Sequence, residues 1–242
     1  MYNQAINYLE IQRIAMFKIA FIALLSYPLL AGFFPKTIHT SVTNVEGETI
    51  TLKHALPKNG MSAAVVHTYT NDLTAITSYL AQTSKKAKAV LIDSDIAHHD
   101  KLPTIQTKVS KGDKVIGGYL YNNVLLLAPD AATYTKTINS YSKKWIHPDL
   151  YALFLSNEGE SVPTKENLFT FAKKYQVGLV YMIQKDKAIL LDPLSGKVIS
   201  EKSMKHLPSK GQYPFYMHFE KLDSGWFGSD DEGNYYDTVG AF

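Results

Sequence analysis

The chain of 242 residues contains no cysteine and a single arginine, Arg13, among its 25 basic residues. Without cysteine there can be no disulfide framework, no thiol nucleophile, no zinc site of the cysteine type and no lipid-modified cysteine anchor. Arginine dominates base-edge readout of DNA and bidentate phosphate pockets, so a nearly arginine-free protein is poorly suited to either. The formal net charge of +3 is also small for a nucleic-acid-binding protein of this size. We therefore expect no nucleic-acid partner.

The sequence also lacks the common catalytic signatures. It has no Gly-x-Ser-x-Gly elbow, no phosphate loop ending in Gly-Lys-Ser/Thr and no His-Glu-x-x-His pair. Two clusters contain side chains that can bind metals, one within residues 93–100 and the other within 230–237, but neither has a recognised ligand spacing. We interpret both as charged loops and predict no enzymatic activity, no cofactor and no metal. A metal-dependent module built on Asp93, His98 and His99 is the least favoured alternative.

An apolar run near the N-terminus predicts export. Residues 19–34 are 16 uncharged and mostly apolar residues that follow Lys18. A spanning helix needs about 20 apolar residues, whereas the core of a secretory signal has roughly 7–15 after a positive start. Pro28 also interrupts a helix here. Residues 1–34 are thus predicted to be a signal peptide, or, alternatively, an uncleaved anchor that would be the protein's only membrane contact. We expect a protein of the periplasm or the outer cell surface.

Residues 38–130 read as a β-rich portion with one helix. Apolar residues around Glu46-Gly47-Glu48 predict a hairpin, and Asn59-Gly60 predicts a turn before another strand. Apolar spacings of three and four predict a helix over 72–83. Further strands are expected over 87–93, 108–117 and 119–128. The short strands are typical of a small barrel of SH3-like size.

Residues 131–212 read as an α/β portion. Asp130 and Thr164 are suitable caps for two helices. The apolar residues of the first helix are Tyr134, Ile138, Tyr141 and Trp145. Strands are expected over 151–155, 177–183, 188–191 and 197–200. The predicted class is α+β, with the barrel-like portion packed against a layer of mixed or antiparallel strands.

Residues 213–242 form an acidic aromatic segment with a charge of −5, whereas residues 33–212 carry +7. This segment either folds back on the basic body or docks a partner, because aromatic anchors carry much of the energy of protein interfaces. Paired lysines at predicted helix ends suit the helix dipole, and they also offer a surface to an acidic or lysine-binding protein. The candidate partner-binding residues are Lys85, Lys86, Lys88, Lys185, Lys187, Trp226, Phe227, Tyr235 and Tyr236.

Five stretches carry a family resemblance: TNVEGETITL at 43–52, NGMSAAVVHTY at 59–69, VSKGDKVIGG at 109–118, NNVLLLAPD at 122–130 and FYMHFEKLDSGWFG at 215–228. In this order they resemble the N-terminal domain of bacterial plasminogen-binding proteins of the PgbA/PgbB type. The resemblance implies a non-enzymatic cell-envelope protein. For some members it also implies capture of plasminogen, whose kringle domains bind lysine side chains, best where the lysine is the C-terminal residue of a polypeptide.

The sequence departs from that pattern at its end. Its last residues are Ala241-Phe242, so plasminogen would have to be bound through internal lysines beside carboxylates, such as Lys185-Asp186-Lys187. The expected partner is plasminogen or, as the alternative, the proteins of a periplasmic envelope assembly such as the flagellar motor.

Overall fold

The protein is α+β, with two sheets and four short helices in the residues that the computed structural model describes, which are 32–70, 73–93, 107–219 and 233–242. Residues 1–31 are outside these ranges, and with them most of the predicted signal peptide or anchor. None of the helices in the described ranges has both the length and the apolar character needed to span a bilayer.

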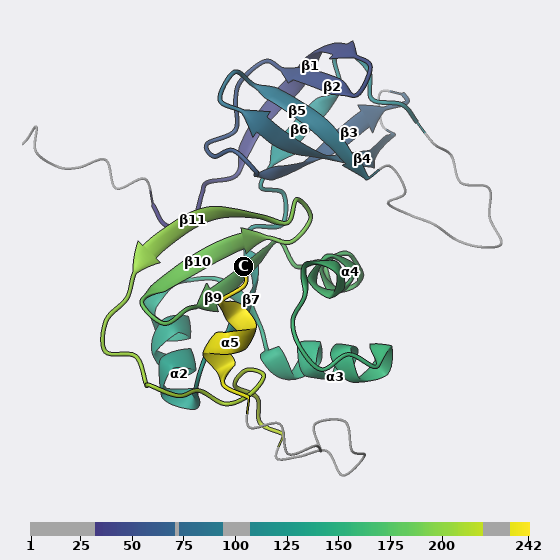
Figure 1. Ribbon diagram of the computed structural model, residues 1–242. Helices are drawn as coiled ribbons and strands as arrows, with labels where there is room; N and C mark the ends of the chain where they lie inside the picture. Colours follow the sequence, from purple (N-terminus) through teal and green to yellow (C-terminus); the bar gives the residue numbers. More distant parts are fainter. Residues whose placement is uncertain (1–31, 71–72, 94–106, 220–232) are drawn as a thin grey trace, which may run out of the picture. The chain divides into compact units, whose positions relative to one another are not determined.

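The first sheet is a closed, antiparallel barrel of six strands in the order β1-β2-β5-β4-β3-β6 (Figure 1). Its strands are β1 (Ile38–Glu46), β2 (Thr49–Leu52), β3 (Ser62–Thr68), β4 (Thr74–Ser84), β5 (Lys88–Asp93) and β6 (Lys114–Gly117). The predicted hairpin at Glu46-Gly47-Glu48 joins β1 to β2, with Gly47 in the left-handed region at φ 59°. Likeness to an SH3 barrel remains a prediction.

The helix predicted over residues 72–83 is wrong, because most of this segment is strand β4. Its buried side chains alternate with a period of two, as a strand requires, at Ser78, Leu80 and Gln82. Because two of these three residues are polar, the apolar residues alone do not show the period of two that indicates a strand. Gln82 is satisfied inside by the backbone of Leu56, whose N–H lies 2.6 Å from Oε1 and whose carbonyl lies 3.0 Å from Nε2.

The second sheet is mixed and has the order β11-β10-β9-β7-β8 (Figure 1). Its strands are β7 (Asn123–Leu127), β8 (Lys144–Ile146), β9 (Leu179–Ile183), β10 (Lys187–Asp192) and β11 (Lys197–Ser203). Strand β7 is parallel to both β8 and β9, whereas β9, β10 and β11 are antiparallel neighbours. The backbone therefore passes from the barrel to the second sheet between residues 117 and 123.

The helices are α2 (Ala131–Ser140), α3 (Pro148–Glu158), α4 (Lys165–Tyr175) and α5 (Tyr235–Val239). Asp130 and Thr164 cap α2 and α4 as predicted, with side-chain oxygens that accept from Thr133 and Asn167 N–H groups. The first helix is shorter than predicted, since Tyr141 ends it and Trp145 lies in β8.

The strand predicted over residues 151–155 is wrong, because this run is the middle of α3. Five consecutive apolar residues suit a buried strand and a buried helix equally. The flanking residues favour the helix: Pro148 occupies its first turn, and Gly159 ends it in the left-handed conformation at φ 72°.

A hydrophobic core lies between the second sheet and the helices α3, α4 and α5. Alternate residues of β7, Leu125 and Leu127, point into it, together with buried residues of these helices such as Tyr151, Phe171 and Tyr235. The opposite face of the sheet packs against an aromatic cluster in which Phe34 lies 5.0 Å from Tyr141 and 6.1 Å from Tyr181, centroid to centroid.

A buried carboxylate, Asp192 at the end of β10, joins the barrel to the second sheet. Its Oδ2 accepts from the backbone N–H of Ser62 in β3 at 2.7 Å and from the hydroxyl of Tyr121 at 2.5 Å. Its Oδ1 accepts from the N–H groups of Leu194 and Ser195 at 3.0 and 3.1 Å. Burial raises the pKa of the Asp192 carboxyl, and the hydrogen bonds from Ser62, Tyr121 and Ser195 oppose this shift.

We predict that Tyr121→Phe lowers the free energy of unfolding by about 2 kcal/mol, because it removes a hydrogen bond to a buried carboxylate. Asp192→Asn should cost more, since an amide nitrogen cannot accept from two of the four donors. Urea unfolding followed by circular dichroism measures both. Tyr119→Phe, at an exposed neighbour, is the control and should change the unfolding free energy by less than about 0.5 kcal/mol. Equal stability of Tyr121→Phe and the control would contradict the predicted role of the network.

A second constraint is the close approach of two backbone segments at Gly178, just before β9. A Cβ atom there would lie 2.1 Å from the carbonyl oxygen of Leu120. We predict that Gly178→Ala costs about 3 kcal/mol or prevents folding, because backbone on both sides must move. Gly47→Ala is the matched control: it meets no atom within 4 Å and should cost only about 1 kcal/mol for its left-handed backbone. Thermal melts of both variants test the prediction, which fails if their losses are equal.

Candidate functional site

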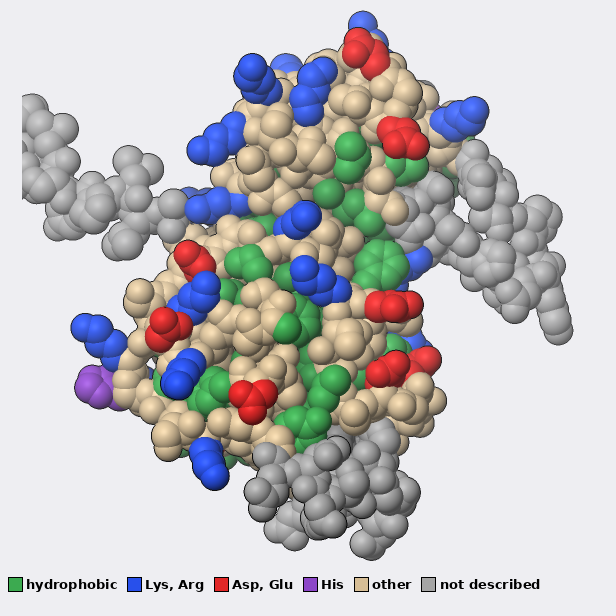
Figure 2. All heavy atoms as spheres, viewed as in Figure 1, with side chains coloured by type: hydrophobic (Ala, Val, Ile, Leu, Met, Phe, Trp, Pro, Cys, Tyr) green, Lys and Arg blue, Asp and Glu red, His purple; other side chains and the backbone are tan. Residues whose placement is uncertain are grey.

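Two hairpin turns present the lysines predicted to bind a partner. Lys85 and Lys86 are exposed in the turn between β4 and β5, whereas Lys88 is half-buried and its Nζ donates to Thr51 Oγ1 at 2.8 Å. Lys185 and the adjacent Asp186 are exposed in the turn between β9 and β10. Figure 2 shows lysine side chains projecting singly from one face of the molecule, some of them beside acidic side chains.

Several lysines already have contacts within the protein. The Nζ of Lys187 forms an ion pair with Glu201 Oε2 at 3.0 Å, across strands β10 and β11. Lys202 donates to the Tyr141 hydroxyl and lies 4.7 Å from the centre of that ring, and Lys143 lies 4.6 Å from the ring centre of Phe34. A partner would have to displace these contacts, whereas the tip residue Lys185 projects beyond the strands.

Other predicted residues fall outside the described ranges. Trp226 and Phe227 are within residues 220–232, and His98 and His99 are within residues 94–106. Asp93 ends strand β5, but its side chain is not described. These predictions therefore stay untested.

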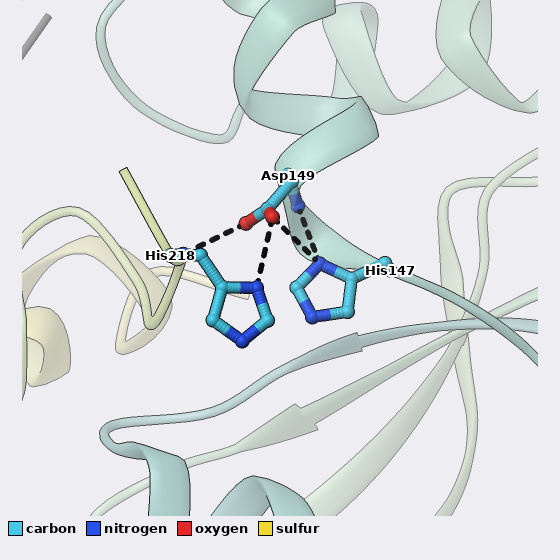
Figure 3. A group of neighbouring side chains, drawn as sticks. All are labelled: His147, Asp149 and His218. Atoms are coloured by element: carbon cyan, nitrogen blue, oxygen red, sulfur yellow. Dashed lines mark hydrogen bonds and ion pairs between the residues drawn. The ribbon is translucent and has the colours of Figure 1, made fainter. Parts of the chain in front are cut away.

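The structure brings together three titratable side chains that the sequence did not connect: His147, Asp149 and His218 (Figure 3). His147 and Asp149 lie at the start of α3, and His218 lies in the segment that follows β11. Asp149 Oδ2 is 3.2 Å from His147 Nδ1 and 3.0 Å from His218 Nδ1. The two imidazole rings are stacked, 4.5 Å apart and inclined by 11°.

Backbone groups hold this histidine–aspartate cluster in place. The N–H of His218 donates to Asp149 Oδ1 at 2.9 Å, and the N–H of Asp149 donates to His147 Nδ1 at 3.2 Å as a helix cap. Tyr134 and Tyr216 flank the rings, with centroids 5.2 Å from His147 and 5.5 Å from His218, respectively. Burial lowers the pKa of His147, which favours its neutral, ligand-capable form, although Asp149 opposes this shift.

Local sequence patterns could not identify this cluster. His147 and Asp149 are two residues apart, but His218 is 69 residues beyond Asp149. Only the path of the segment after β11, back to the start of α3, brings them together.

A family model described as plasminogen-binding protein pgbA N-terminal matches residues 37–239. The chain belongs to this family. No curated protein and no solved structure matches it.

The predicted resemblance is thus confirmed, and the region matched by the plasminogen-binding family extends from just before the barrel to the last residue of α5. Helix α5 is therefore part of the family's domain. Tyr235 is fully buried, and its hydroxyl donates to Leu127 O at 2.7 Å and accepts from Ile183 N–H at 3.2 Å. Tyr236 is also largely buried, with its hydroxyl donating to Pro208 O at 2.8 Å. Helix α5 thus folds back onto the body of the protein, and the rings of Tyr235 and Tyr236 are part of its core.

We predict that Tyr235→Phe destabilises the protein by about 2 kcal/mol, because it leaves a buried N–H and a buried carbonyl of the second sheet without their partner. Tyr236→Phe should cost less than half as much, since water can reach Pro208 O more readily. Chemical unfolding of the two variants measures the difference. A loss confined to Tyr236→Phe would contradict this placement of α5.

Proposed function

We propose that this protein is an exported, non-enzymatic protein of the cell envelope that binds plasminogen through exposed lysine side chains. The family match supports a protein partner and a binding role. The apolar run at residues 19–34 supports export. The periplasm and the outer surface are both compatible with these observations, and binding of a host protein requires the outer surface.

The observation that carries the proposal is the adjacent pair Lys185 and Asp186 at an exposed hairpin tip. A C-terminal lysine, the preferred ligand of a kringle, combines an ammonium group with a nearby carboxylate. An internal lysine can imitate this combination only where an acidic side chain is close and both are exposed. Lys185 and Asp186 are consecutive in the sequence and both exposed, so this tip can offer the two charges together.

The other lysine tip is a poorer imitation. Residues 84–88 read Ser-Lys-Lys-Ala-Lys, so Lys85 and Lys86 have no acidic neighbour in their turn. They provide charge for long-range attraction but not the paired charges of a C-terminal lysine. Lys187 acts indirectly: its ion pair with Glu201 joins β10 to β11 directly after the Lys185–Asp186 tip and so holds the turn in place.

We predict that immobilised protein retains plasminogen and releases it when a lysine analogue is added. The double variant Lys185→Gln/Asp186→Asn should weaken binding about tenfold, which corresponds to about 1.4 kcal/mol. The matched control Lys85→Gln/Lys86→Gln should weaken it less than about threefold, because it removes only long-range attraction. Surface plasmon resonance at fixed ionic strength measures both, because the two variants differ in net charge and salt screens that difference.

Three outcomes would contradict the proposal at different levels. Absence of retention removes plasminogen as the partner and favours the envelope-assembly alternative. Retention that is insensitive to the lysine analogue removes the lysine-dependent mode. A larger loss in the Lys85→Gln/Lys86→Gln control moves the site to the β4–β5 turn.

A further inference from the structure

We propose that His147, Asp149 and His218 bind one first-row divalent cation, of which Zn²⁺ is the best match. The proposal is independent of plasminogen binding, because it concerns the start of α3 and the segment after β11 and not the Lys185–Asp186 tip.

The donor set has the composition of a zinc site. Two imidazoles and one carboxylate are the protein ligands of many zinc centres that keep a fourth position open. The same set disfavours Ca²⁺ and Mg²⁺, since these ions take oxygen ligands almost exclusively. With no cysteine in the sequence, histidine and carboxylate are the strongest zinc ligands available to the protein.

The spacing of the donor atoms also fits. Ligands about 2.0–2.1 Å from a tetrahedral ion are about 3.3 Å from one another. Asp149 Oδ2 lies 3.2 Å from His147 Nδ1 and 3.0 Å from His218 Nδ1, which is close to that separation. The three donor atoms all lie within 4.8 Å of one another, so small shifts suffice to enclose an ion.

Much of the arrangement is in place before any ion binds. The backbone N–H of His218 holds Asp149 Oδ1 and leaves Oδ2 directed between the two rings (Figure 3). Hydrogen bonds of this kind orient a carboxylate for coordination. On the histidine side, the long 3.2 Å bond from Asp149 N–H to His147 Nδ1 is the contact that an ion would replace.

Binding requires one movement. An imidazole coordinates through a lone pair in its ring plane, and the two rings are now nearly parallel. The His218 side chain is 64% exposed, so it can turn about its Cβ–Cγ bond toward the ion without disturbing the core. The fourth position then faces solvent, where water or a partner's side chain can complete the coordination.

A bound ion would cross-link two distant parts of the protein. It would fix the segment around His218 to the start of α3, 69 residues earlier, next to the core that α3 and α5 share. Ligands that bind only the folded state stabilise it by mass action, so the melting temperature should rise with the Zn²⁺ concentration.

The test is calorimetric titration of the full-length, tag-free protein with ZnCl₂ after removal of metals by a chelator. We expect one equivalent to bind with a Kd below about 10 µM, because three ligands held together bind more tightly than any one of them alone. His218→Ala and Asp149→Asn should each weaken binding at least about tenfold, since each removes or neutralises one ligand. His54→Ala, at an exposed histidine of the barrel portion, should leave it unchanged.

A spectroscopic readout keeps the test independent of stability. Co²⁺ in place of Zn²⁺ should give the visible bands of a tetrahedral site, and His218→Ala should abolish them while its circular dichroism stays native. Binding that is lost equally in His54→Ala, or a stoichiometry near zero, would overturn the proposal. A cation bound with the same affinity by wild type and His218→Ala would also overturn it.

Discussion

The buried carboxylate of Asp192 is the constraint on which the arrangement of the two sheets depends. A charge in the interior is tolerated only where donors surround it. Its donors come from three places: Ser62 in the barrel, Tyr121 in the connection between the sheets, and the turn that follows Asp192 itself. In the same turn, the Ser195 hydroxyl donates to the carbonyl of Gly60 at 2.6 Å. The Asp192 side chain therefore holds together β3, β10 and the connection between the sheets, against which Gly178 packs at Leu120.

Elements with a strong local signal could be predicted from the sequence. The Glu46-Gly47-Glu48 hairpin and the caps Asp130 and Thr164 follow from turn and cap rules that act within a few residues. Strand β4 could not, because its inward positions include polar Ser78 and Gln82, and Gln82 is satisfied by distant backbone. Helix α3 could not, because a short apolar run has no period.

The candidate sites divide in the same way. A lysine-rich turn can be recognised from sequence, because charge next to a predicted turn indicates exposure, and Lys85, Lys86 and Lys185 are exposed. Which lysine is already paired with an acid on a neighbouring strand depends on strand register, as Lys187 and Glu201 show. The histidine–aspartate cluster depends on the path of the backbone after β11 and has no local signature.

Helix α5 has a consequence for the order of events in biosynthesis. The core of the second sheet includes Tyr235 and Val239, so it cannot be completed until residue 239 has been synthesised. Until then the buried faces of β7 and β9 lack the hydroxyl that joins Leu127 to Ile183. Under the proposed export this delay is useful, because a nascent polypeptide that cannot close its core early stays unfolded long enough to pass through a translocation channel.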